Sequence, residues 1–101
     1  MIAPALLDHE AIARACERYG VARLRIFGSA LTDRFDPEHS DVDFLVDYSP
    51  GAERTFSALF AMRDELGQIV GRPVDLLDVR TVRNPYFASA AFGSAQDVYA
   101  A

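Results

Sequence analysis

Hydrophobic and polar residues follow one another along this chain with two different periods, which predict helices and strands. Apolar residues spaced three and four positions apart mark a first helix, one face of which carries Ile12, Ala15, Cys16 and Tyr19. Asp8 precedes this pattern as an N-cap, and Gly20 follows it as a stop signal. A second helix is expected over about residues 53–70, with an apolar stripe made of Phe56, Leu59, Phe60, Leu66, Ile69 and Val70.

Strands are predicted where apolar residues alternate with polar ones. Residues 21–27, "VARLRIF", and residues 42–48, "VDFLVDY", show the period of two that is typical of a half-buried strand. A third strand, "RPVDLLDV", follows Gly71, and the pair Asn84 and Pro85 has the residue types that open a last helix. The predicted order is helix, strand, strand, helix, strand, helix. Between the first two strands lies a polar, irregular loop with room for one helical turn.

The composition narrows the class of protein. The chain has 101 residues, of which 50% are hydrophobic, and this suits one domain over residues 1–101. No apolar run reaches the roughly 18 residues that a membrane span needs, and the N-terminus lacks the basic region of a secretory signal. A single cysteine and a net charge of -5 fit a cytoplasmic protein that does not bind nucleic acid directly, because that affinity depends on neutralising phosphates.

Two carboxylates stand at the start of the second predicted strand. Asp41 and Asp43 are separated by one residue, so on a strand they point to the same side, a few ångströms apart. Like charges at that distance repel each other, and their burial is costly. A divalent cation removes the repulsion, and Mg²⁺ is typically held by one or two carboxylates together with substrate phosphates. The pair therefore predicts a magnesium site that handles a phosphorylated substrate.

Asp75, one residue into the third predicted strand, can complete this site. If that strand pairs beside the second, its carboxylate reaches the same spot as those of Asp41 and Asp43. Three carboxylates around two Mg²⁺ ions roughly 3.5–4 Å apart serve in-line phosphoryl or nucleotidyl transfer. Gly28 and Ser29, directly after the first strand, suit the phosphates: glycine lets the backbone come close, and the serine hydroxyl and successive N–H groups can cradle anionic oxygens.

At this point the sequence resembles a known family. The stretch "GSALTDRFDPEHSDVDFLV", followed by "VDLL", closely resembles the DNA polymerase β-like nucleotidyltransferase superfamily, and within it the minimal nucleotidyltransferase (MNT) branch. Gly28, Ser29, Asp41, Asp43 and Asp75 occupy the Gly-Ser, Asp-x-Asp and third-carboxylate positions of that pattern. The resemblance covers nearly the whole chain. It implies an α+β fold, the polymerase β-like nucleotidyltransferase fold, with helices packed on a small mixed sheet in the order α-β-β-α-β-α.

The resemblance also implies an activity, cofactors and a partner. Proteins of the MNT branch resemble antitoxins that transfer AMP from ATP onto a tyrosine of a partner HEPN-domain ribonuclease toxin. The implied cofactors are two Mg²⁺ ions and ATP, and the implied assembly is a hetero-oligomer with the toxin. Catalysis and metal binding then belong to Asp41, Asp43 and Asp75, and nucleotide binding to Gly28, Ser29, Ser40 and Arg34. Many relatives carry an arginine soon after Gly-Ser, where this chain has Thr32, so Arg34 is the candidate to replace it.

Each of these residues also has a plainer structural interpretation. Asp41 alone would suit a solvated loop cap, Asp75 an exposed position on an edge strand, and Ser29 a helix N-cap. Ser40 is expected to cap the loop and orient Asp41, with a ligand role as the lesser option. Asp78 is the other candidate for the third carboxylate. It lies three positions after Asp75, so on a strand it points to the opposite face. Cys16 is expected in the core, His39 in a solvated loop and Asp47 at the surface.

Two other functions compete with protein adenylylation. The chain could neutralise a toxin by binding and occlusion alone, and the Thr32 departure favours this hypothesis. A weaker alternative is transfer to a small, aminoglycoside-like acceptor. The lack of a recognisable second domain to hold such an acceptor argues against it.

Overall fold

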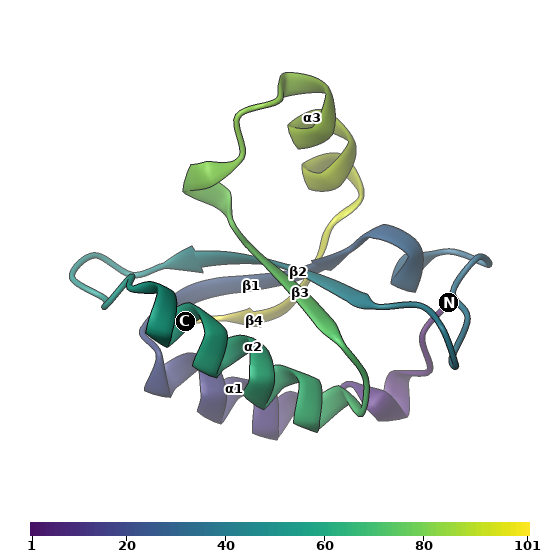
Figure 1. Cartoon of the computed structure of the whole chain (residues 1–101), viewed down its shortest axis with the longest axis horizontal. Helices are drawn as coiled ribbons and strands as arrows, with labels where there is room; N and C mark the ends of the chain where they lie inside the picture. Colours follow the sequence, from purple (N-terminus) through teal and green to yellow (C-terminus); the bar gives the residue numbers. More distant parts are fainter.

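The computed structural model describes the backbone of residues 1–101 and every side chain except that of Ala91. Four strands form one sheet in the order β3-β2-β1-β4: β1 is Val21–Phe27, β2 is Val42–Tyr48, β3 is Val74–Asp78 and β4 is Gln96–Ala100. β1 is antiparallel to both β2 and β4, whereas β2 and β3 run parallel and are joined by a helical crossover. The predicted mixed sheet is therefore confirmed (Figure 1).

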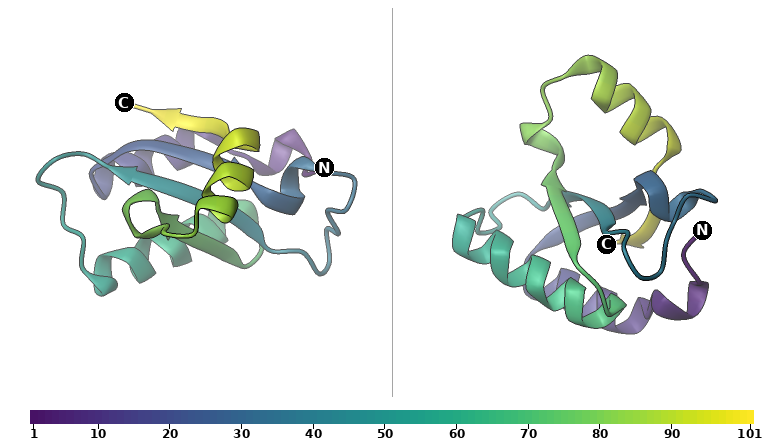
Figure 2. Two further views of the ribbon diagram at one scale, coloured as in Figure 1. Left: turned by 90° about the horizontal axis from the view of Figure 1, so that it is seen from above. Right: turned by 45° about the vertical axis from the view of Figure 1, so that its right-hand side comes forward.

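Helices cover the two faces of the sheet unequally. α1 (His9–Arg18) and α2 (Phe56–Val70) lie side by side on one face, and α3 (Pro85–Ser94) stands on the other (Figures 1 and 2). The main core fills the space under α1 and α2 and contains fully buried residues such as Ile12, Phe44 and Leu66. A smaller cluster on the α3 side is built on Phe27 and Leu45. Because α3 covers only part of its face, the rest of that face is left for a site.

The predicted N-caps of α1 and α3 are confirmed, and α2 has a cap that was not predicted. The Asp8 carboxylate accepts a hydrogen bond from the Ala11 N–H at 3.1 Å, and Thr55 Oγ1 accepts one from Ala58 at 3.1 Å. Asn84 accepts from the first N–H groups of α3, which has Pro85 at its first turn. Because Thr55 caps α2, that helix begins at Phe56 rather than near residue 53. Each cap satisfies N–H groups that have no partner inside the helix.

The buried stripe of α2 differs from the predicted one. Phe56 and Phe60 are 79% and 48% exposed, and their rings stack on each other with centroids 6.3 Å apart. The buried face instead follows Met62, Leu66 and Val70, which are spaced four residues apart. Leu66 and Val70 of the predicted stripe are therefore confirmed as core residues, and Leu59 and Ile69 pack against the core. Only Phe56 and Phe60 were wrongly assigned to it, and Met62 was left out. The two exposed phenylalanines thus form an apolar patch outside the core.

A fourth strand was missed by the sequence analysis. The prediction ended the chain with a helix, but after α3 residues Gln96–Ala100 form β4 at the edge of the sheet. β4 is only partly buried, and its partner β1 lies far away in the sequence. Neither its pattern nor its neighbours therefore carried a strong strand signal. The observed order is α-β-β-α-β-α-β.

No helix in the described part of the chain has the length and apolar character needed to span a bilayer.

Candidate active site

The parallel pairing of β2 and β3 brings two carboxylates side by side. Asp43 and Asp75 are direct partners in the register of the two strands, so their side chains leave the same face of the sheet. Asp43 is half-buried and Asp75 is exposed. The condition set by the sequence, that the third strand must lie beside the second, is therefore met.

This closeness alters the acidity of Asp43. Burial raises the pKa of its carboxyl from 3.8 to about 6, and the charge of Asp75, a hydrogen bond shared with the Asp75 side chain and the charge of Asp41 act in the same direction. Without a cation the Asp43 carboxyl is therefore harder to ionise than a solvated one, because burial and a neighbouring carboxylate both disfavour its charged form. A bound divalent cation would remove this cost, so the donor set fits Mg²⁺ by its chemistry.

Gly28 brings the backbone against this pair. It follows the last residue of β1, has φ +76°, and opens a short 3₁₀ helix, Gly28–Leu31. A Cβ atom at this position would lie 2.4 Å from Oδ2 of Asp43, so the Asp43 carboxylate would have to move away. Both the positive φ and the close approach require glycine here. The backbone at Gly28 thus passes directly beside a carboxylate. The phosphate-binding roles of Gly28 and Ser29 stay predictions.

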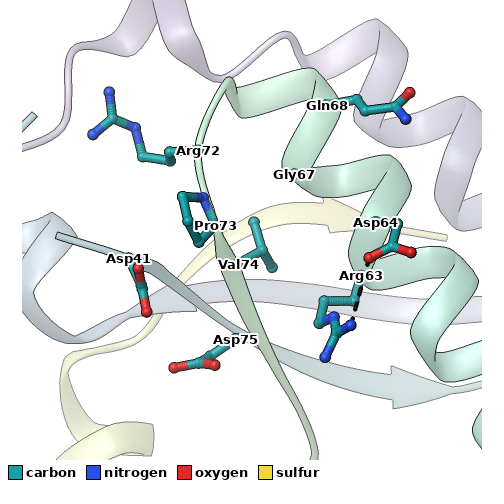
Figure 3. Close-up of a pocket in the computed structure, with 9 residues that line it drawn as sticks. All are labelled: Asp41, Arg63, Asp64, Gly67, Gln68, Arg72, Pro73, Val74 and Asp75. Atoms are coloured by element: carbon teal, nitrogen blue, oxygen red, sulfur yellow. Dashed lines mark ion pairs between the residues drawn. The ribbon is translucent and has the colours of Figure 1, made fainter. Parts of the chain in front are cut away.

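Asp41 lies just before β2 and is exposed. Together with Asp75 it lines a hollow of about 670 Å³ at the β3 edge of the sheet, whose other walls come from α2 and the turn after it. We call this the edge hollow. Figure 3 shows the Asp41 and Asp75 side chains extending to the same side of β3, with Arg63 of α2 on the other side of the strand. Asp64, the next residue, pairs with Arg63 at 3.5 Å.

A second hollow opens on the α3 side of the sheet. It has a volume of about 380 Å³ and is lined by Phe27, Asp43, Asp75, Leu76, Leu77 and Phe87. We call this the face hollow. Asp75 belongs to both hollows, and Asp41 and Asp43 to one each. Asp75 therefore stands on the rim between the two hollows.

The three predicted metal ligands do not all lie equally close to one another. Among the side chains that the structure describes, no group of three His, Cys, Asp or Glu residues is arranged to hold a metal ion. Asp43 and Asp75 form the close pair, and Asp41 lies at the edge hollow beside them. The predicted three-carboxylate metal site thus stays a prediction.

The remaining predicted nucleotide ligands lie in or next to the loop between β1 and β2. Ser29 is the second residue of the 3₁₀ helix, whose N-cap is Phe27, so the N-cap interpretation of Ser29 is wrong. The Ser40 hydroxyl accepts a hydrogen bond from the Asp36 N–H at 2.9 Å and closes the loop before Asp41, as expected. Arg34 is exposed, and its N–H bonds to the Thr32 hydroxyl at 3.2 Å. The ligand roles of Ser40 and Arg34 stay predictions.

Other polar residues singled out in the sequence have structural partners. Asp78 binds Arg54 and caps the next turn through the Arg80 N–H, so it is occupied outside the carboxylate pair. His39 lies in the solvated loop and pairs with Asp36 at 2.8 Å. Cys16 is buried, and burial raises the pKa of its thiol to about 12, which confirms a core role.

Sequence reasoning missed the residues that shape the two hollows. Arg63 was part of a helix pattern, and Phe87 was expected only to pack in the core or against a partner. Arg63 lines the edge hollow because α2 packs against β3, and Phe87 lines the face hollow because α3 lies over Phe27 of β1. The only sequence feature that pointed to Phe87 was its position as an aromatic residue in the first turn of the last helix.

Paired carboxylates on neighbouring strands, beside a glycine that admits the backbone, have the chemistry of sites for in-line phosphoryl or nucleotidyl transfer. A family model described as "Nucleotidyltransferase domain" matches residues 9–98, and the chain belongs to this family of enzymes. From Methanocaldococcus jannaschii, "Putative protein adenylyltransferase MJ1379" is 30% identical over 70 residues, 69% of each chain. "Putative protein adenylyltransferase MJ0128", from the same organism, is 33% identical over 70 residues, 69% of this chain and 68% of the relative.

Solved structures share the fold. One titled "Structure of putative minimal nucleotidyltransferase" superposes with a TM-score of 0.70 at 30% identity, over 87% of this chain and 86% of that chain. A chain from a complex of tri-AMPylated Shewanella oneidensis HEPN toxin with MNT antitoxin gives a TM-score of 0.66 at 15% identity, over 94% and 71% of the two chains. A toxin–antitoxin structure with AMP-PNP gives 0.71 at 15% identity, over 93% and 74%. The last two likenesses concern the fold alone.

Proposed function

We propose that this protein transfers AMP from ATP to a tyrosine hydroxyl of a partner HEPN ribonuclease toxin, and so acts as its antitoxin. The observation that carries the proposal is the register of Asp43 with Asp75 beside the close approach of Gly28. Relatives named as protein adenylyltransferases and the fold shared with an MNT antitoxin–toxin complex support the acceptor and the partner. The expected cytoplasmic location stays a prediction.

In this proposal each predicted site residue has a separate role. The triphosphate lies along Gly28 and Ser29, with Arg34 and Ser40 as further candidate contacts. Asp41, Asp43 and Asp75 would hold two Mg²⁺ ions, which would neutralise the phosphates and the charge of the leaving pyrophosphate. Asp75 accepts the proton of the incoming hydroxyl in this proposal, and its exposure and its position at the border of both hollows support that role.

The transfer itself is a single displacement at the α-phosphorus of ATP. The acceptor oxygen forms a bond to phosphorus, and the bond between the α-phosphorus and the bridging oxygen breaks. The electron pair of that bond leaves with pyrophosphate, and the acceptor proton passes to Asp75 or to water. Positioning and charge neutralisation supply most of the catalysis in phosphoryl transfer.

The test uses ATP labelled in its α-phosphate, Mg²⁺ and the protein encoded beside this gene. We expect label to appear on the partner, to disappear with EDTA, and to disappear with Asp41→Ala or Asp43→Ala. Asp47→Ala is the matched control, because Asp47 lies on the same face of β2 but pairs across the sheet with Arg23. An unlabelled partner, or equal labelling by Asp41→Ala, refutes the catalytic proposal.

A second candidate is neutralisation by binding alone. The observation that favours it is the exposed pair Phe56 and Phe60, an apolar patch of the kind that marks an interaction site. Under this alternative the double variant Asp41→Ala, Asp43→Ala still protects cells from the partner, whereas Phe56→Ser with Phe60→Ser does not. Under the enzymatic proposal the double aspartate variant loses protection.

A further inference from the structure

One aromatic ring faces the site without being part of the core. Phe87, in the first turn of α3, is 41% exposed although its side chain is large and apolar. It meets Phe27 edge to face, with ring centroids 6.1 Å apart and an interplanar angle of 85°. Phe27 is itself only 7% exposed, so it fixes the floor on which Phe87 rests. The open part of the Phe87 ring lines the face hollow together with Asp43 and Asp75.

The face hollow has two chemically different ends. Asp43 and Asp75 form the charged end, where the proposed function places the α-phosphate. Phe27, Leu77 and Phe87 supply apolar walls next to it. Because Gly28 follows Phe27 directly and lies against Asp43, a triphosphate along Gly28 and Ser29 reaches the carboxylates from the side of β1. The sugar and base then have the face hollow beside them.

The size of this hollow suits the nucleoside part of a nucleotide. Its volume of about 380 Å³ lies within the range of roughly 300–1,000 Å³ typical of small-molecule sites. A nucleobase is a flat ring system that stacks on an exposed aromatic side chain whatever its pattern of hydrogen-bonding groups. The edge hollow, which shares Asp75, is left for the acceptor.

We propose that Phe87 is the stacking surface for the nucleobase of the donor nucleotide, with the face hollow as the nucleoside subsite. This inference rests on the proposed function. A ring held mainly by stacking favours purines by their larger area and discriminates weakly between adenine and guanine. The first turn of α3 is therefore a binding element and not only a cover for the sheet.

The experiment compares two ligands that differ in the presence of the nucleoside. Calorimetry with Mg²⁺ measures binding of α,β-methylene-ATP, which cannot transfer AMP, and of inorganic triphosphate. The variants are Phe87→Ala and Phe87→Leu, the second of which keeps apolar contact with Phe27. Tyr86→Ala is the matched control, because Tyr86 is 85% exposed in the same helical turn and does not line the hollow.

We expect both Phe87 variants to bind α,β-methylene-ATP about tenfold or more weakly, as the loss of one stacked base predicts. Inorganic triphosphate should bind within about twofold of wild type in every variant, and so should both ligands with Tyr86→Ala. Unchanged nucleotide binding overturns the inference, even if the KM for the partner protein rises. Equal loss of both ligands also overturns it, since it would indicate damage to the fold.

Failure of this inference is distinct from failure of the proposed function. Wild-type protein that labels its partner but tolerates Phe87→Leu refutes only the nucleoside subsite. Wild-type protein that binds neither ligand in the presence of Mg²⁺ refutes both.

Discussion

Replacing Asp43 by asparagine should stabilise the metal-free protein while it abolishes AMP transfer. In the folded chain Asp43 lies opposite Asp75, and burial first, then the charges of Asp75 and Asp41, raise its pKa from 3.8 to about 6. A carboxyl whose pKa is raised on folding is more easily ionised in the unfolded chain. Stability therefore falls as the pH rises from about 4 through 6, and at pH 7 the full cost is present.

The size of this cost follows from the pKa. Each pKa unit corresponds to about 1.4 kcal/mol, so ionised Asp43 lowers the free energy of unfolding at pH 7 by at most about 3 kcal/mol. Asp43 is half-exposed, and screening by solvent reduces this to about 1–2 kcal/mol. For a domain of this length, 1 kcal/mol shifts Tm by about 4–8 °C. Asparagine keeps the shape of the side chain and removes the charge, so a rise in Tm of roughly 5–10 °C is expected.

Thermal unfolding in EDTA, followed by circular dichroism, measures the effect. At pH 7.5 we expect the Asp43→Asn protein to melt above wild type. At pH 4 the difference should shrink, because wild-type Asp43 is then protonated. Added Mg²⁺ should raise the Tm of wild type and leave that of the variant nearly unchanged. Asp47→Asn, on the same face of β2, is the control and should melt close to wild type at every pH.

A lower Tm for Asp43→Asn at pH 7.5 in EDTA would refute this reasoning, because it would mean that the charged carboxylate stabilises the fold. A difference that stays constant between pH 4 and 7.5 would equally show that ionisation of Asp43 is not the cause.

Three further predictions concern other parts of the chain. Gly28→Ala should lower the free energy of unfolding by about 1–3 kcal/mol and the rate of AMP transfer at least tenfold, because the new Cβ would meet Asp43 at 2.4 Å. Wild-type turnover by this variant would contradict the close approach. Leu66→Ala should cost about 2–5 kcal/mol in urea unfolding, and Phe56→Ala less than about 0.5, so equal losses would mean that the buried face of α2 is misassigned. With its pKa raised to about 12, Cys16 should react with iodoacetamide at pH 8 at least about a hundredfold faster in urea than in the folded protein, and rapid labelling of the native state would argue against its burial.

The sequence predicted the parts of the site that local geometry determines. The residue types after β1 are enough to mark Gly28. Alternation also predicts that Asp41 and Asp43 point to one side, but β2 begins only at Val42, so strand geometry does not determine where the Asp41 side chain lies. Asp75 could be assigned only conditionally, since its place depends on the register of two strands separated by α2. A long-range pairing of this kind leaves no local trace in the pattern of hydrophobic residues.

The misassigned parts share the same cause. β4 pairs with β1 across most of the chain length, and its alternation is weak because it is a partly exposed edge strand. Phe56 and Phe60 have the spacing of a buried row, but which face of α2 meets the sheet is decided by the fit of Met62 and Leu66 into the core. Phe87 became a candidate ligand contact only once the position of α3 over the sheet was known.

The parallel register of β2 and β3 also determines where this chain can change length. If a residue inserted in the short turn between α2 and β3, residues 71–73, were passed on to the strand, β3 would slide by one position and Asp75 would move to the opposite face of the sheet. Val74 and Leu76 would leave the core in the same step. Selection for a stable fold thus also preserves the position of Asp75, because the register that buries Val74 and Leu76 on one face of β3 presents the carboxylate on the other face.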